Sequence, residues 1–391
     1  MNWIDRRDVS LSPCAEYETD RIEAILRTHF AAMGCDGTFF AGKRVVLKPN
    51  LVTAVEPDKG VTTHPSLIEA ACRVITSLGG RVTIAESGGG PYTEATMKNA
   101  YRITGTADAA RRGGAELNFD PSSVPASYPD GKQSCAFELL RPVADADIIV
   151  NIAKLKTHTL TMLSACVKNL FGCVPGLKKF ELHARFDDQR QFQSALVDLC
   201  AMLCSQKDCI HILDAVVGME GNGPTQGTPR AIGAVLAAGS AHALDLAAAR
   251  ILGFEPREVP TLAAAIDRGL CPASADALDI SGALDDFVQR DVKKTPAQSD
   301  VAFYLSGGGL IAGAVDKMLH RILTPFPQLH AAECIHCGKC AGICPAKAIT
   351  MTDGLPRIDR RVCIHCFCCQ EFCPKGAMRV GRTWIARTLN K

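Results

Sequence analysis

The chain has 391 residues, of which 47% are hydrophobic and 21% charged, so it is long enough for two domains or for one large domain with an appendage. Its 43 basic and 41 acidic residues leave a net charge of +2, which provides no overall field for binding nucleic acid or a membrane surface. The amino terminus lacks the apolar stretch of a signal peptide, and apolar runs elsewhere fall far short of the roughly 20 residues that span a bilayer, so we expect a soluble cytoplasmic protein.

The first predicted element is a helix over residues 16–30, and a strand, a second helix and a second strand follow it. Residues 44–47 are a short apolar run typical of a buried strand. A helix should begin at Pro65, because proline is favourable at the first helical position, and end at Gly79. The apolar run at 81–85 then completes a βαβ unit.

The same alternation continues along the chain. Further strands are predicted at 147–152, 210–213 and 232–237, and further helices at 192–203 and 242–252. This order of elements predicts an α/β domain with a mostly parallel sheet over residues 1–323.

Polar residues gather after the predicted strands, where ligands bind in open α/β sheets. The candidates for holding a cofactor are Lys48, Asn50, His64, Ser87, Gly88, Gly89, Lys168 and Asn169. The candidates for catalysis are Lys154, Lys156, His158, Asp214 and Glu220. Lysines attract phosphate or carboxylate groups, while Asp214 and Glu220 could manage protons or bind a cation. We therefore expect an anionic organic ligand at these strand ends.

Each of these features also has a simpler interpretation. The SGGG sequence at 87–90 lacks the spacing of a phosphate-binding loop and is also typical of a turn. His64 suits the start of a helix, and the lysines of 154–158 suit a solvated basic edge. The ligand hypothesis depends on four separate strand ends contributing such residues together.

Three cysteines, Cys200, Cys204 and Cys209, lie on and just after the helix predicted over 192–203. Buried reduced cysteines behave as small hydrophobic residues, which favours a core role for them over a metal site.

The strongest pattern in the chain is a cysteine run that occurs twice near the carboxyl end. Both copies read C-x2-C-x2-C-x3-C-P, and each cysteine of the second copy follows its counterpart by 29 residues. The cysteines are Cys334, Cys337, Cys340, Cys344, Cys363, Cys366, Cys369 and Cys373. This run is typical of ferredoxins that bind two [4Fe-4S] clusters, in which the fourth cysteine of each run binds the other cluster.

The ligand rule assigns the cysteines to two sets. Cys334, Cys337 and Cys340 should bind one cluster together with Cys373, and Cys363, Cys366 and Cys369 should bind the other together with Cys344. A zinc site is the alternative, but zinc prefers four ligands in two CxxC pairs. Cys368, beside Cys369, is interpreted as a bystander or a substitute ligand.

Short apolar segments around the runs predict a small α+β ferredoxin-like domain over residues 331–391. Residues 324–330 are expected to be a linker, because two prolines in that segment favour an extended path.

Several longer segments carry a resemblance to a known family. The stretches KPNLV, TTHP, ESGGG, NIAKLKTHTLTMLSACVKNLFG and ILDAVVGMEGNGPTQGTPR, followed by the two cysteine runs, resemble the DUF362 family of iron-sulfur proteins over about residues 40–380. The resemblance implies such a domain fused to a ferredoxin, in mostly anaerobic microbes, and supplies no substrate.

These observations leave three functional hypotheses. In the first, a ferredoxin-coupled oxidoreductase passes low-potential electrons to an anionic substrate or to a bound cofactor such as a flavin. In the second, the chain is an electron carrier that docks to redox partner proteins. In the third, it acts in maturation or regulation, although no nucleic-acid-binding motif supports a transcriptional role.

Overall fold

The computed structural model describes residues 6–186, 188–294 and 325–384. The chain divides into two compact units, residues 1–294 and residues 295–391. The domain boundary predicted at 323 lies outside the described residues.

The first unit alternates strands and helices. Its strands are β1 (Asp8–Pro13), β2 (Arg44–Pro49), β3 (Arg81–Ile84), β4 (Glu116–Leu117), β5 (Ser123–Ser127), β6 (Ala136–Leu140), β7 (Ile148–His158), β8 (Met162–Ser164), β9 (Asp208–Glu220), β10 (Thr228–Ala238) and β11 (Asp279–Ser281). Its α-helices are α1 (Thr19–Ala32), α2 (Gly37–Phe40), α3 (Pro65–Ser77), α4 (Glu94–Ile103), α5 (Thr106–Gly113), α6 (Arg141–Asp145), α7 (Cys166–Asn169), α8 (Gly176–Arg185), α9 (Gln189–Gln206), α10 (Ala241–Ile251) and α11 (Pro260–Asp267).

A mixed, mostly parallel sheet forms the centre of this unit, as the sequence predicts. Among the described residues it has nine strands, eight of them in the order β11-β1-β10-β9-β7-β2-β3-β4, with β8 paired to β7. The pairs β2/β3, β2/β7, β7/β9 and β3/β4 are parallel, whereas β10 is antiparallel to both β9 and β1. The carboxyl ends of β2, β3 and β7 therefore meet at one edge of the sheet.

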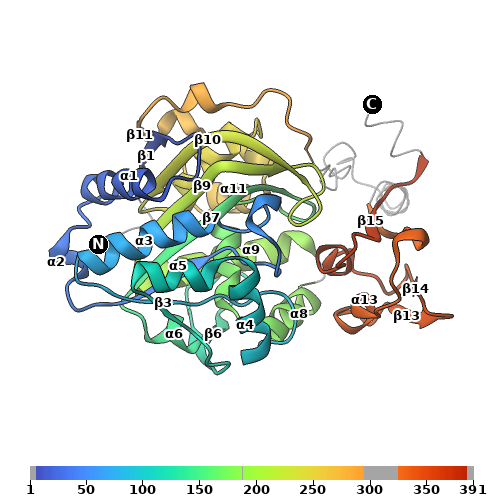
Figure 1. The fold of residues 1–391 in the computed structure, drawn as a ribbon. Coiled ribbons are helices and arrows are strands. Elements are labelled where there is room, and N and C mark those ends of the chain that lie inside the picture. Colours follow the sequence, from blue (N-terminus) through green and yellow to red (C-terminus); the bar gives the residue numbers. More distant parts are fainter. Residues whose placement is uncertain (1–5, 187, 295–324, 385–391) are drawn as a thin grey trace. The chain divides into compact units, whose positions relative to one another are not determined.

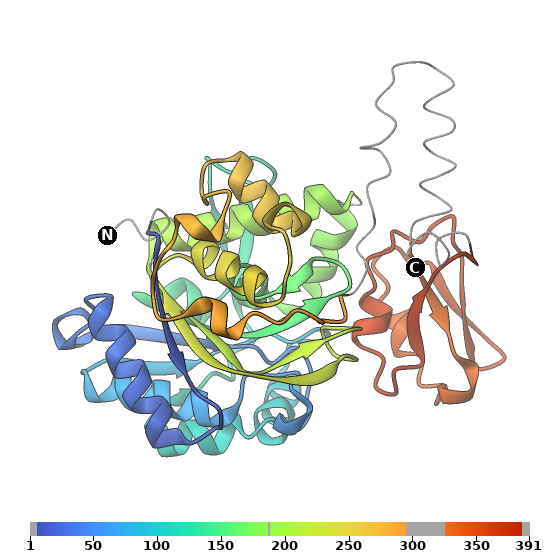
Figure 2. The same ribbon diagram turned by 90° about the horizontal axis from the view of Figure 1, so that it is seen from above.

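Helices cover both faces of the sheet (Figure 2). The early helices α1, α3 and α5 pack against one another on one face, and the later helices α10 and α11 lie on the other. Apolar side chains of the strands, such as Leu47 and Val150, pack with Leu26 and Val74 of the first helix layer. This burial is the main stabilising force of the α/β architecture.

The helix predicted from Pro65 is confirmed as α3, with proline at its first position. His64 is its N-cap residue, and its Nδ1 accepts a hydrogen bond from the Ser66 amide at 3.2 Å. This cap satisfies one of the amides that no helical carbonyl can reach.

Two strands extend far beyond their predicted carboxyl ends. β7 extends to His158 and β9 to Glu220, where the sequence indicated strands ending near 152 and 213. Lys154, Lys156 and Asp214 therefore lie within strands and not in the loops after them. The sequence pattern did not predict the longer strands, because they carry buried polar side chains at positions that normally hold apolar ones.

The second unit contains β12 (Phe326–Leu329), α13 (Lys339–Gly342), β13 (Ile349–Thr352), β14 (Leu355–Ile358), α14 (Cys368–Glu371) and β15 (Met378–Gly381). β12 pairs with β15 and β13 pairs with β14, both antiparallel. Figure 1 labels β13, β14 and β15. Part of the segment expected to be a linker thus forms the strand β12. The duplicated sequence builds a duplicated structure, because α14 and β15 repeat α13 and β13 at the same 29-residue offset.

Within the described residues, no helix is both long enough and apolar enough to cross a bilayer.

Candidate functional site

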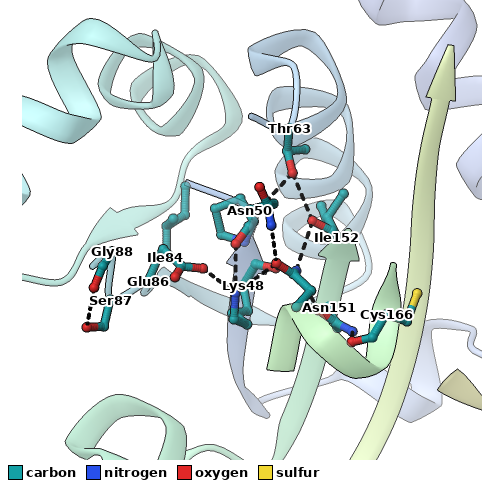
Figure 3. Close-up of polar contacts among 12 residues, drawn as sticks. Lys48, Asn50, Thr63, Ile84, Glu86, Ser87, Gly88, Asn151, Ile152 and Cys166 are labelled. Atoms are coloured by element: carbon teal, nitrogen blue, oxygen red, sulfur yellow. Dashed lines mark hydrogen bonds and ion pairs between the residues drawn. The ribbon is translucent and has the colours of Figure 1, made fainter. Parts of the chain in front are cut away.

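A buried ion pair lies where β2 and β3 end (Figure 3). The Nζ of Lys48 donates hydrogen bonds to Glu86, to the carbonyl of Pro49 at 2.9 Å and to Oδ1 of Asn169 at 3.2 Å. The Lys48 side chain is fully buried and that of Glu86 nearly so. A charge pair removed from water in this way is retained only with good partners, and Lys48 has three oxygens around its ammonium.

The backbone at Gly172 approaches this pair closely. A Cβ atom at that position would lie 2.3 Å from Oε1 of Glu86 and 2.5 Å from Nζ of Lys48. The carbonyl of Gly172 also accepts a hydrogen bond from the amide of Ser87 at 3.2 Å. A β-carbon at this position would displace the ion pair, which favours glycine in the segment that covers it.

A second buried lysine, Lys179 of α8, binds the SGGG loop. Its Nζ donates hydrogen bonds to the carbonyls of Ser87 and Gly88, the latter at 3.2 Å. Gly88 and Gly89 are partly exposed, so the loop reaches the surface of the unit. Lys179 thereby holds the loop by its Ser87 and Gly88 carbonyls, and the Lys179 ammonium interacts electrostatically with that of Lys48.

Lysine side chains gather around this loop. We define the lysine cluster as Lys48, Lys168 and Lys179, in which the ammonium of Lys179 interacts with those of Lys48 and Lys168 and with the carboxylate of Glu86. Lys168 and Lys179 also lie over the ring of Phe171, at 5.0 and 5.9 Å from its centroid. Burial, together with repulsion from Lys48 and Lys168, lowers the pKa of Lys179 to about 7.

A chain of amide side chains leads away from the cluster. Lys156 donates to Oδ1 of Asn50 at 2.9 Å. Asn50 in turn donates to Oδ1 of Asn169 at 2.8 Å, and Asn169 donates to Oδ1 of Asn151 at 2.8 Å; Asn50 and Asn151 are labelled in Figure 3. These residues come from the segments after or within β2 and β7 and from α7. The predicted residues Asn50, Lys156 and Asn169 are thus joined in one buried network.

Another buried lysine, Lys154, forms a triad with residues from distant parts of the chain. Nζ of Lys154 lies 3.0 Å from Oδ2 of Asp214 and 2.6 Å from the hydroxyl of Tyr17, and Tyr17 donates to Oδ1 of Asp214 at 2.7 Å. Burial lowers the pKa of Lys154, and burial beside Asp214 raises the pKa of Tyr17 well above its ordinary value. The triad can therefore hold or release a proton at the amine of Lys154 while Tyr17 remains a phenol.

His64 joins this triad by stacking on Tyr17, with ring centroids 3.7 Å apart. Its backbone amide donates to Oδ2 of Asp214 at 3.0 Å. Burial lowers the pKa of His64 to about 4, so its ring is neutral at physiological pH.

Two of the predicted catalytic residues are engaged elsewhere. Nδ1 of His158 accepts hydrogen bonds from the amides of Leu160 and Thr161, which fixes the turn after β7. Glu220 accepts a hydrogen bond from Arg230 at 2.7 Å on the neighbouring strand β10. Both contacts are structural.

Tyr17 and Lys179 belong to the site although sequence reasoning did not single them out. Tyr17 precedes α1 and is 197 residues from Asp214 along the chain, so no local pattern connects the two. Lys179 follows Lys178 in the segment FGCVPGLKK, and the sequence does not show which of the two is buried. In α8, Lys179 lies on the buried face and Lys178 is exposed.

In the second unit, a cavity is lined by four cysteines, Cys334, Cys337, Cys340 and Cys373. Three come from the first run and the fourth from the second. Four thiols around one cavity match the donor set that a [4Fe-4S] cluster requires.

Backbone amides point at the fourth cysteine of each run. The amide of Ala348 donates to Sγ of Cys344 and the amide of Ala377 donates to Sγ of Cys373, both at 3.2 Å. Such N–H···S bonds stabilise thiolate charge and tune the potential of a bound cluster. The residues present therefore fit iron-sulfur ligation.

Comparisons with known proteins follow the same division of the chain. Residues 45–250 match the family described as a domain of unknown function, DUF362, and residues 326–374 match a 4Fe-4S dicluster domain. The thylakoid-associated protein sll1697 of Synechocystis sp. is 32% identical over 284 residues, which cover 69% of this chain and 82% of that protein. The dicluster match indicates [4Fe-4S] clusters and an electron-transfer role for the carboxyl-terminal unit.

Among solved structures, a Thermotoga maritima protein aligns with a TM-score of 0.32 at 12% identity. The alignment covers 55% of this chain and 54% of the other.

Proposed function

This chain belongs to the DUF362 family and carries a 4Fe-4S dicluster domain, and from that premise we propose that it is an iron-sulfur redox enzyme. In this proposal, low-potential electrons from two [4Fe-4S] clusters reach an anionic substrate or cofactor bound beside the SGGG loop of the first unit. A flavin is one candidate for that ligand.

The lysine cluster is the observation that carries this proposal. Burial and repulsion from Lys48 and Lys168 lower the pKa of Lys179 to about 7, although the carboxylate of Glu86 acts in the opposite direction. An anion bound beside Lys168 and Lys179 would relieve this repulsion and restore the protonated form of Lys179.

For the clusters we propose the crossed ligand sets, with Cys334, Cys337, Cys340 and Cys373 in one set. The second set takes Cys363, Cys366, Cys369 and Cys344. When bound, the clusters supply electrons one at a time. The N–H donors to Cys344 and Cys373 support the proposal that each fourth cysteine acts as a thiolate ligand.

The triad of Lys154, Tyr17 and Asp214 is proposed to manage protons. Reduction of an organic anion by added electrons requires protons as well, and Lys154 has a lowered pKa with a carboxylate and a phenol within 3.0 Å of its Nζ. Asp214 holds the protonated amine in place, and Tyr17 bridges the two groups.

The proposal is tested by anaerobic reoxidation of the dithionite-reduced protein. Candidate acceptors, including flavin mononucleotide and small carboxylates, are added while the cluster absorbance is followed. We expect one class of anion to reoxidise the protein, and Lys179→Met to raise the concentration needed for half-maximal rate by about 10-fold or more, as for the loss of one charged contact worth 1.5–3 kcal/mol.

Lys178→Met is the matched control. Lys178 is exposed and pairs with Glu181 at 2.9 Å, so its loss should leave the reoxidation unchanged. Equal effects of the two substitutions, or reoxidation only by other redox proteins, would refute an anion site at the lysine cluster.

The electron carrier is the second candidate function. Large hydrophobic side chains are exposed on the second unit, with Ile335 at 53%, Val362 at 48% and Met351 at 38%. Exposed apolar residues beside cluster ligands suit transient docking of a redox partner protein. Reoxidation by proteins alone would favour this function. The cytoplasm remains the proposed location, and the relative named for thylakoid association makes membrane fractionation a useful test.

A further inference from the structure

The four-cysteine cavity of the second unit lies close to its surface. Cys337, which lines this cavity, is exposed, whereas the other seven cysteines of the two runs are partly or fully buried. Its counterpart in the second run, Cys366, is one of the partly buried ones. Electron transfer between proteins becomes slower as the distance between redox centres grows. A cluster in this cavity is therefore well placed to exchange electrons with a docked partner.

Apolar and basic side chains surround the cavity. We call this surface the first-cluster rim and define it by five exposed residues that line the cavity: Ile335, Lys339, Met351, Pro374 and Lys375. Ile335 is 53% exposed and Met351 38%. No acidic residue is among the described residues that line the cavity. Within the described part of the chain, neither Lys339 nor Lys375 forms an ion pair, so both charges are available to a partner.

The duplicated sequence offers an internal comparison for this rim. At the 29-residue offset, three of its residues have counterparts of a different kind or burial, namely Ile364 for Ile335, Cys368 for Lys339 and Ala346 for Lys375. Ile364 and Ala346 are partly buried and Cys368 is buried. Exposed apolar groups between two lysines are thus particular to the first-cluster rim. The ferredoxin-like fold does not require them, since the other copy of the repeat lacks them.

The charge of the second unit has the same sign as the rim. Residues 325–384 contain eight lysines and arginines but four aspartates and glutamates. Unpaired surface charges attract a partner of opposite sign and speed its approach. Exposed apolar side chains beside such charges are typical of surfaces that bind another protein. The rim therefore fits a protein whose docking face is acidic.

We propose that the first-cluster rim docks an acidic redox protein, which exchanges one electron with the cluster in the four-cysteine cavity. Lys339 and Lys375 steer the encounter through their charge, and Ile335 and Met351 bury apolar area in the complex. In the outward direction, one electron leaves the reduced cluster and enters the partner's redox centre, and no bond forms or breaks. This inference rests on the electron-transfer role of the second unit and is independent of the anion site at the lysine cluster.

The test uses the full chain with its clusters in place and two one-electron carriers of opposite charge. Rubredoxin is a small acidic iron protein, and cytochrome c is a basic haem protein. Isothermal titration calorimetry measures binding between the oxidised proteins, so this measurement does not depend on any small-molecule acceptor. We expect rubredoxin to bind, with an affinity that falls as salt rises, and cytochrome c not to bind.

The lysines are tested by the rate at which the reduced chain converts ferric rubredoxin to the ferrous form. Lys339→Gln/Lys375→Gln should slow this second-order reaction by about 10-fold at low salt and remove most of its salt dependence. Lys347→Gln/Arg357→Gln is the matched control, because both residues are exposed but do not line the cavity. Iron analysis of each variant checks that both clusters are retained.

The apolar part of the rim is tested by equilibrium binding. Ile335→Ser should raise the dissociation constant for rubredoxin by about 5-fold or more. Val362→Ser should leave it unchanged, because Val362 is similarly exposed, at 48%, but does not line the cavity.

Three outcomes would overturn the proposal. The first is equal binding of the two carriers, and the second is an equal effect of the two double variants. The third is a lysine double variant that changes the reduction potential of the clusters but not the binding of rubredoxin. Sedimentation of the chain with phosphatidylglycerol vesicles, without binding to rubredoxin, would also overturn it and assign the rim to a membrane surface.

Discussion

The buried pair of Lys48 and Glu86 should be among the most sensitive positions of the first unit. Glu86→Gln keeps the size of the side chain but removes its charge. Lys48 would then remain fully buried with only neutral oxygens, those of Pro49 and Asn169, around its ammonium. An uncompensated buried charge is much less stable than a paired one.

The expected loss is about 3–5 kcal/mol, the usual cost of removing one partner from a buried pair. At about 2–4 °C per kcal/mol for a domain of this size, the melting temperature should fall by roughly 6–20 °C. Replacing both charges in Lys48→Met/Glu86→Leu should recover much of this loss, since no buried charge remains unpaired.

Thermal unfolding followed by far-ultraviolet circular dichroism measures these changes. Glu181→Gln removes the exposed pair with Lys178 and serves as the control, with an expected loss of about 0–1 kcal/mol. If Glu86→Gln is no more destabilising than Glu181→Gln, or if the double variant is worse than the single one, the ion pair does not have the role assigned to it.

Three further predictions concern other parts of the chain. Between the folded pKa of about 7 and the ordinary pKa of 10.5, Lys179 binds fewer protons in the folded chain than in the unfolded chain. The free energy of unfolding should therefore increase as pH rises through this range. Urea titrations at several pH values measure this increase, and it should be smaller in Lys179→Met. Gly172→Ala should destabilise the first unit by about 1–3 kcal/mol in the same assay, because its Cβ would displace the ion pair, whereas Gly37→Ala, with no atom within 4 Å of the new Cβ, should have little effect. Cys373→Ser should lower the iron content by about half and alter the electron paramagnetic resonance signal of the cluster bound by the first cysteine run. Cys135 is exposed, and Cys135→Ser should keep all the iron. Unchanged iron in Cys373→Ser would exclude the crossed ligand set.

Much of the candidate site could be anticipated because it lies on residues with distinctive chemistry. Lysines and asparagines are rarely buried, so Lys48, Asn50, Lys154 and Asn169 are conspicuous among apolar runs. The structure joins them in buried networks, although it also places Lys154 and Asp214 inside strands that sequence reasoning ended too early. Where buried polar residues interrupt an apolar pattern, the period of a strand cannot be followed.

The sequence alone determined the α/β order of elements and the two cysteine runs, because both depend on spacing along the chain. Only the tertiary structure placed Tyr17 against Asp214 and Lys179 against the SGGG loop. These contacts join residues tens to hundreds of positions apart, so their existence depends on how the sheet and helices pack. Spacing indicates which residues can bind a metal or a charge, whereas packing decides which of them meet and which are kept from water.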